Sequence, residues 1–129
     1  MSYTEREQKN LKLVEGMLAN VLGPLNSGPV DHYFRSDYIQ HSPMADDGSA
    51  ALKAFLEWAK GASPHYVHDV KRIMVDGDYV VVHAHTIREP GTLGFAVIDI
   101  FRVQEGLIAE HWDALCEVPA ESRNANGMF

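Results

Sequence analysis

Two kinds of hydrophobic periodicity divide the chain near residue 62. Before this point, apolar residues recur every three or four positions, as they do along one face of a helix. This spacing predicts three helices, at about residues 5–22, 28–34 and 50–60. After this point, apolar and polar residues alternate, which is typical of half-buried strands. The alternation predicts four strands between about residues 66 and 116, and a short extended piece at 38–41 precedes the third helix.

Turn residues mark where these elements end. Gly23–Pro24 follows the first predicted helix, and Asp76–Gly77 and Gln104–Glu105–Gly106 join successive strands as hairpins. Three helices followed by an antiparallel meander predict an α+β fold, with the helices on one face of a curved sheet that can enclose a concave interior. We expect one domain over residues 1–129, with helices at about 5–60, strands at about 66–116 and an irregular tail at 117–129.

Composition narrows the classes of partner. The chain has 129 residues, of which 46% are hydrophobic, and a net charge of −7, which disfavours nucleic acids and anionic membrane surfaces as partners. Its first ten residues are polar and charged, and no apolar run reaches membrane-spanning length. The single cysteine, Cys116, allows no internal disulfide, which is consistent with a reducing compartment. We therefore expect a cytoplasmic protein.

Titratable residues interrupt the apolar faces of the last two predicted strands. Asp99 shares a strand face with Val97 and Phe101, and His111 and Asp113 share a face of the next strand. A carboxylate among apolar side chains is costly unless it is paired. These groups therefore either satisfy one another inside a core or line a pocket. In a pocket, a carboxyl with a raised pKa beside an imidazole can transfer protons near neutral pH.

Other histidines extend the set of candidates. His83 and His85 share one face of their strand and would line the pocket if that face is concave. With His111 or Asp99 they have the spacing for a three-ligand zinc site, but no pattern of residues that would orient such ligands is visible, and we expect no metal. His41 ends the extended piece, in a turn that could face the mouth of the cavity.

Some side chains are expected outside the pocket. His68 lies at a strand start and is predicted to be on the surface, and Trp112 alternates away from His111 toward the outer face of the sheet. Ile98 and Ile100 are also apolar on that outer face, so the face needs a cover. This predicts a homodimer that buries the outer face.

Five segments of the sequence carry a family resemblance. They are YIQHSP at 38–43, DGDYVVVH at 76–83, DIFR at 99–102, EHWD at 110–113 and NANGMF at 124–129. Together they resemble the SnoaL-like proteins, which are polyketide-cyclase relatives within the nuclear transport factor 2-like superfamily, where ketosteroid isomerase also belongs. The resemblance covers nearly the whole chain. It implies a cone-shaped α+β fold with a deep apolar pocket, usually assembled as a homodimer through the sheet.

The resemblance also implies a chemistry. SnoaL-type cyclases close a ring by intramolecular aldol condensation, without a metal or organic cofactor, using an aspartate in the cone as acid and base. Ketosteroid isomerase has its base at the place that His41 takes here, and a carboxylic acid that donates to an oxyanion at the place where Asp99 falls. The present sequence departs from this pattern because it has an imidazole at the base position.

These observations predict a small, cofactor-independent enzyme that acts on a small hydrophobic carbonyl compound by aldol-type condensation or cyclisation, or by isomerisation. The candidate catalytic residues are His41 or Asp113 as base, Asp99 as donor to the oxyanion, and His111 as orienting group or acid. The candidate substrate-binding residues are Tyr38, His83, His85 and Phe101. The alternative is a non-catalytic ligand-binding or dimerisation module of the same fold, and a metal-dependent hydrolase is the third possibility.

Overall fold

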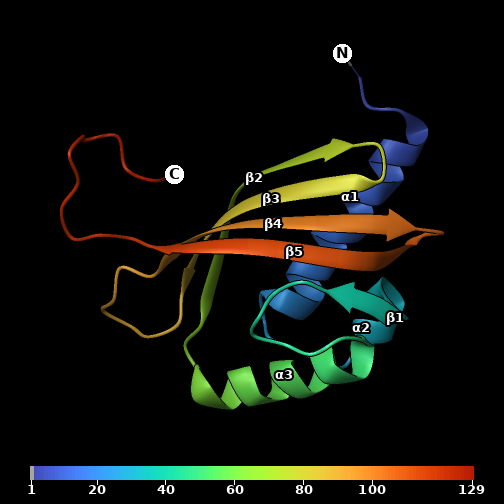
Figure 1. Cartoon of the computed structure of the whole chain (residues 1–129), viewed down its shortest axis with the longest axis horizontal. Coiled ribbons are helices and arrows are strands. Elements are labelled where there is room, and N and C mark those ends of the chain that lie inside the picture. Colours follow the sequence, from blue (N-terminus) through green and yellow to red (C-terminus); the bar gives the residue numbers. More distant parts are fainter. Residues whose placement is uncertain (1) are drawn as a thin grey trace.

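The computed structural model describes residues 2–129 as a curved five-stranded sheet with helices on one side (Figure 1). The helices are α1 (Glu5–Met17), a π-helical turn η1 (Leu18–Leu22) that continues it, α2 (Val30–Tyr33) and α3 (Ser49–Ala62). The strands are β1 (Phe34–Gln40), β2 (Val67–Asp76), β3 (Tyr79–Ile87), β4 (Phe95–Gln104) and β5 (Leu107–Glu117). The predicted α+β class, in which helices from the N-terminal half of the chain cover one face of a curved sheet, is confirmed.

The strands follow the order β1-β5-β4-β3-β2. The four later strands form the antiparallel meander that the alternation predicts, and irregularities in register at 70–72 in β2 and 102–103 in β4 add curvature to it. The short extended piece expected at 38–41 is the end of a longer strand, β1, which pairs in parallel with β5. Because β1 takes Phe34, the second helix is only four residues long instead of reaching that residue.

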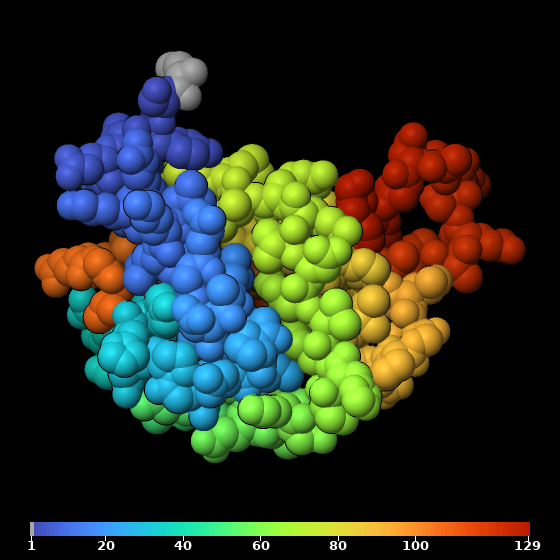
Figure 2. Space-filling model, turned by 180° about the vertical axis from the view of Figure 1, so that it is seen from behind, coloured from blue at the N-terminus to red at the C-terminus, as the bar shows by residue number. Residues whose placement is uncertain are grey.

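Helix α1 is fixed at its first turn and along one face. Thr4 and Glu7 form the capping box that their spacing indicates. Glu7 also accepts a hydrogen bond from the Gly77 backbone at 3.0 Å, and the buried Asn10 side chain donates to the Gly77 carbonyl at 3.0 Å. These contacts tie the start of α1 to the β2–β3 turn. Figure 2 shows α1 covering part of the sheet while β2 stays visible beside it.

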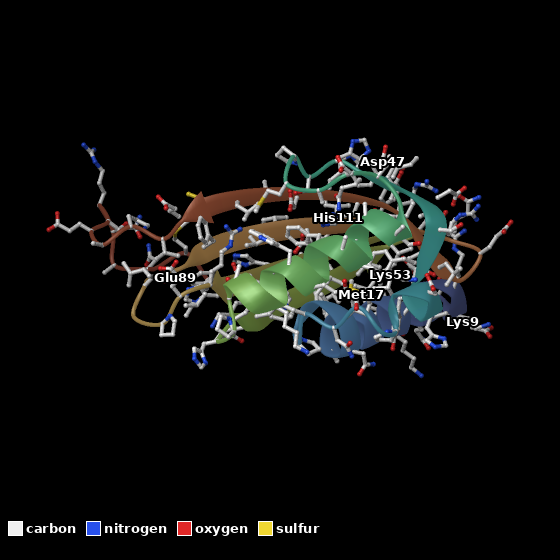
Figure 3. The ribbon with its side chains drawn as sticks, turned by 90° about the horizontal axis from the view of Figure 1, so that it is seen from below. Lys9, Met17, Asp47, Lys53, Glu89 and His111 are labelled. Carbon is white, nitrogen blue, oxygen red and sulfur yellow. The ribbon has the colours of Figure 1, made fainter. Side chains whose placement is uncertain are left out.

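Helix α3 lies against β1 and closes the concave side of the sheet (Figure 3). Its start is held by Gly48, which has a φ of 87° and donates its backbone N–H to the Tyr38 carbonyl at 3.0 Å. Leu52 and Leu56 face the core and are buried, whereas Trp58 is 64% exposed. The helix thus presents one apolar face to the interior and leaves an aromatic side chain at its outer edge.

Among residues 2–129, no helix combines the length and the apolar character that crossing a membrane requires.

The C-terminal tail, residues 118–129, forms neither helix nor strand. Phe129 at its end folds back against the sheet, with its ring centroid 4.4 Å from that of His85.

Candidate functional site

A cavity of about 130 Å³ lies between the concave face of the sheet and the helices. Figure 3 shows His111 in this interior, whereas Glu89 lies at the periphery of the molecule. An engineered apolar cavity of about 150 Å³ binds benzene, so the space suits a ring-sized group. The structure brings five of the predicted site residues together here, namely Tyr38, Asp99, Phe101, His111 and Asp113. Their positions support the predicted pocket, and their chemical roles stay predictions.

A buried histidine–aspartate pair forms the centre of the site. His111 Nε2 lies 2.8 Å from Asp99 Oδ1, and the two residues are 9% and 6% exposed. In the β4–β5 register, Phe101 lies opposite His111, and the two rings stack with centroids 4.7 Å apart. The pair is therefore held by a hydrogen bond on one side and by an aromatic face on the other.

Gln40 fixes the orientation of this histidine. The Ser42 backbone N–H lies 3.0 Å from Gln40 Oε1, and because a backbone N–H can only donate, that atom must be the amide oxygen. The amide nitrogen of Gln40 donates to the Tyr38 hydroxyl at 2.6 Å. His111 Nδ1 lies 2.7 Å from the same Gln40 oxygen, so Nδ1 must carry a hydrogen.

This assignment determines how many protons the pair holds. In a neutral imidazole with a hydrogen on Nδ1, the other nitrogen is an acceptor. Since a carboxylate also only accepts, the contact between His111 Nε2 and Asp99 Oδ1 needs one more proton. That proton sits either on an imidazolium facing a carboxylate or on a carboxylic acid facing a neutral imidazole. In both cases the pair holds a transferable proton inside the cavity.

Asp113 faces the same space from β5, opposite Asp99 in the strand register. Its Oδ1 is buried and has no hydrogen-bond partner within the described residues 2–129. Burial raises the pKa of the Asp113 carboxyl above its usual value, an effect that His111 opposes and the nearby Asp99 reinforces. A side-chain hydrogen bond with Ser42 and the charge of Arg88 also lower this pKa, but burial outweighs them, so the carboxylate is a stronger base than one in water. Asp113 therefore combines access to the cavity with raised basicity.

A second group of polar residues lines the cavity from β2, β3 and their flanking residues, and the sequence did not single it out. Its members are Tyr66, His68, Thr86 and Arg88. The prediction that His68 is a surface residue is wrong, because it is partly buried in this wall and its pKa is lowered by burial. Strand alternation could have predicted that Thr86 points inward, because Thr86 lies on the same face as Val82 and Ala84. His68 is paired opposite Thr86 and therefore shares that face.

The expectation that His41 faces the cavity is wrong. In β1, Tyr38 and Gln40 point inward, and His41 lies on the opposite, convex side of the sheet. There its ring stacks on Trp112, with centroids 4.9 Å apart, and its Nε2 lies 2.7 Å from a Glu110 carboxylate oxygen. Gln40, at the preceding position, was not among the predicted site residues, and it provides the side chain that enters the site.

The expectation that His83 and His85 line the cavity is also wrong. The inward face of β3 consists of the buried side chains of Val80, Val82, Ala84 and Thr86, so the alternate residues point to the convex face. There both imidazoles stack on Phe129, and His83 also contacts Arg72. The zinc site considered from His83, His85 and His111 cannot form, because His111 lies on the other face.

Another set of residues has metal-ligand geometry. Asp99, His111 and Asp113 each have one potential ligand atom, and these three atoms all lie within 4.8 Å of one another. Both nitrogens of His111 are already in hydrogen bonds, to Gln40 and to Asp99, so a metal bound by this imidazole would have to displace one of them. Both nitrogens of His111 are thus occupied by hydrogen bonds to protein groups, and the Asp113 carboxylate faces the cavity.

Comparisons with known proteins agree on the fold. The sequence pattern of the SnoaL-like domain matches residues 14–111. TsrD from Streptomyces laurentii has a similar structure, with 20% sequence identity, 88% of this chain and 91% of that chain covered, and a TM-score of 0.70. No curated protein matches the chain.

Two further solved structures are similar. A proposed polyketide cyclase from Bacillus cereus has 17% identity, coverage of 83% of this chain and 74% of that chain, and a TM-score of 0.72. A proposed SnoaL-like polyketide cyclase from Jannaschia sp. has 20% identity, coverage of 89% and 90%, and a TM-score of 0.71. At these identities the likeness to solved structures establishes the fold alone.

Proposed function

Because the chain belongs to the SnoaL-like family, we propose that its cavity binds a small hydrophobic carbonyl compound and catalyses proton transfer on it without a cofactor. The reaction is an aldol-type condensation or cyclisation, with isomerisation as the second form. One observation carries this proposal: Asp113 Oδ1, which is buried and has no hydrogen-bond partner among residues 2–129, stands beside a pair that holds a transferable proton. A base and an acid in one cavity are what enolisation requires.

In the proposed reaction, the Asp113 carboxylate removes a proton from the carbon next to the carbonyl group. The electrons of the broken C–H bond form the C=C bond of an enol while the carbonyl oxygen takes the proton held by His111 and Asp99. The enol carbon then attacks a second carbonyl carbon, or it is reprotonated at another position. In the condensation, the oxygen of the second carbonyl takes the proton from Asp113 as the C–C bond forms, and the enol O–H returns its proton to the pair. In the isomerisation, Asp113 gives its proton to the other carbon while the enol O–H returns its proton to the pair.

The apolar and aromatic lining supports this assignment. Phe101 and Tyr38 are buried beside the proton-holding pair, and their rings would make uncharged van der Waals contacts with the substrate. Burial raises the pKa of the Tyr38 phenol to about 12, so Tyr38 stays neutral in the working range. The apolar and aromatic side chains keep the local dielectric low around these groups, which strengthens the interaction of the developing negative charge on the carbonyl oxygen with the pair.

Exchange of carbon-bound hydrogen for deuterium tests the proposed function without the natural substrate. 4-Phenylbutan-2-one is an apolar ketone with a ring, and its exchange in D₂O can be followed by ¹H NMR. We expect the protein to accelerate exchange next to the carbonyl over the rate in matched buffer. If the ketone binds in the cavity and exchanges no faster than in buffer, the chain is a ligand-binding module instead.

We also propose that the protein is a homodimer through the convex face of the sheet, as the sequence predicts. Exposed apolar side chains on this face support it: Met74, Tyr79 and Ile98 are 49%, 45% and 40% exposed. We expect sedimentation at micromolar concentration to give a dimer, since a stable interface buries about 1,000 Å² or more. Ile98→Glu should give monomers, whereas Tyr3→Glu, at an equally exposed residue before α1, should not. A monomeric wild-type protein would refute the proposed dimer.

The cytoplasmic location expected from the sequence stays a prediction.

A further inference from the structure

Arg88 stands at the edge of the cavity and is not engaged by a carboxylate within the described residues 2–129. Its guanidinium carbon lies 4.6 Å from the centroid of the Phe95 ring, and its Nη2 lies 3.7 Å from the Met44 sulfur. Within residues 2–129 it forms no ion pair, whereas Arg6, Arg35 and Arg102 each do. The cavity therefore has a partly buried cation whose strongest donors face an aromatic ring and a thioether instead of an anion.

Arg88 lies between the cavity that holds Asp113 and two neighbouring hollows. One is a hollow of about 120 Å³ that includes Phe55, Trp58 and Tyr66, and the other is a more open groove that includes Glu89 and Glu117. The charge of Arg88 is near enough to the reaction end to favour the ionised form of Asp113. A molecule that extends from Asp113 toward Trp58 would therefore pass the guanidinium and lie along apolar walls.

We propose that Arg88 binds a carboxylate of the substrate, so that the substrate is a carbonyl compound with an apolar body and one carboxylate group. This inference rests on the proposed function, because it takes the same cavity as the substrate site. The planar guanidinium can donate two parallel hydrogen bonds to a carboxylate, and a cation in apolar surroundings gains more from such a pair than one in water.

The charges around the cavity favour a monoanion. Among residues 2–129, no lysine and no other arginine lines either the cavity or the hollow of about 120 Å³, and Asp99 and Asp113 would repel a doubly charged group. His68 adds no compensating charge near neutral pH, because burial lowers its pKa. A phosphate dianion would keep one uncompensated negative charge near Asp99 and Asp113, whereas Arg88 neutralises the single charge of a carboxylate.

A pair of probes that differ in one group tests the assignment. 3-Phenylpropanoate and 3-phenylpropanamide have the same ring and chain, and calorimetry at pH 7 gives their dissociation constants. We expect the wild-type protein to bind the carboxylate about tenfold or more tightly than the amide, the ratio typical of a charge-assisted hydrogen bond. Arg88→Gln should abolish this preference, Arg88→Lys should retain part of it, and Arg6→Gln, outside the cavity, should leave it unchanged.

Several results would overturn the inference. They are equal wild-type affinity for the two probes, an undiminished preference in Arg88→Gln, no binding of either probe at its solubility limit, or equally strong competition by inorganic phosphate. The ketone exchange described above uses a neutral probe, so it can succeed or fail independently of this result. A carboxylate preference without any exchange would support the Arg88 site and refute the catalytic proposal.

Discussion

Asp113→Asn is expected to lower the rate of ketone hydrogen exchange in the cavity by about 10²–10⁴-fold, the range that a positioned general base contributes. The substitution keeps the size and position of the side chain but replaces the basic oxygen by an amide that cannot accept a proton. Within residues 2–129, Asp113 Oδ1 is the one buried side-chain oxygen that lacks a hydrogen-bond partner, so it is free to accept the proton. The exchange rate measured by ¹H NMR checks this expectation.

Stability provides the control for this variant. Because burial raises the pKa of Asp113 in the folded state, its contribution to stability is full below the pKa of the unfolded chain and is lost as the pH rises through the folded-state pKa. Asp113→Asn removes that loss, so the variant should be at least as stable as the wild type at pH 7. A variant that retains wild-type exchange, or that loses exchange only because it unfolds at pH 7, would contradict the assigned role.

The second large effect concerns the buried pair. His111→Ala is expected to lower the free energy of unfolding by about 3–5 kcal/mol, because it leaves the Asp99 carboxyl buried without a partner. It also removes the hydrogen donor to Gln40 and the ring that stacks on Phe101. Urea unfolding followed by circular dichroism measures the change.

A second histidine in the same chain provides a matched control. His41 also lies within hydrogen-bond distance of a carboxylate, at 2.7 Å from Glu110, but it is on the convex face and 43% of its side chain is exposed. His41→Ala should cost only about 0–1 kcal/mol, as exposed pairs do. Replacing both Asp99 and His111 by leucine should recover much of the loss, because apolar residues often replace a buried pair without penalty. Equal losses in the two single alanine variants would show that burial does not govern the pair.

The sequence predicts the fold well because its evidence is local. The capping box at Thr4, the turn at Asp76–Gly77 and the change of hydrophobic period near residue 62 each depend on neighbouring residues. The parallel pairing of β1 with β5 was not predictable in this way. It joins segments about 70 residues apart, and no local pattern marks which edge of the sheet a short strand will take.

The site was predictable where one face of a strand is clearly apolar. Val97 and Phe101 determine the inward direction of Asp99, and the hairpin then places His111 and Asp113 across from that face. In β3 the inward face begins with the uniformly apolar Val80, Val82 and Ala84, whereas the opposite face carries His83 and His85. Alternation grouped the two histidines correctly, but the prediction placed their face on the concave side although the other face is the more apolar one.

The errors at β1 have a different cause. Gln40 and His41 are adjacent, and whichever one points inward, the other points out. His41 was predicted to point inward because an imidazole can act as an acid or a base, whereas the amide of a glutamine cannot. The structure instead uses the amide of Gln40, which can accept from His111 and donate to Tyr38 at the same time. An amide with both functions is what orienting an imidazole requires.

The pH titration of the Asp113 carboxyl carbon by ¹³C NMR tests most directly whether this cavity is built for acid–base chemistry. Asp37 serves as the internal reference, because its hydrogen bond to Arg35 lowers its pKa, whereas burial raises that of Asp113. The proposed site predicts a midpoint for Asp113 above the ordinary aspartate value of about 3.9 and one for Asp37 below it. A midpoint for Asp113 at or below about 3.9 would contradict its role as the base.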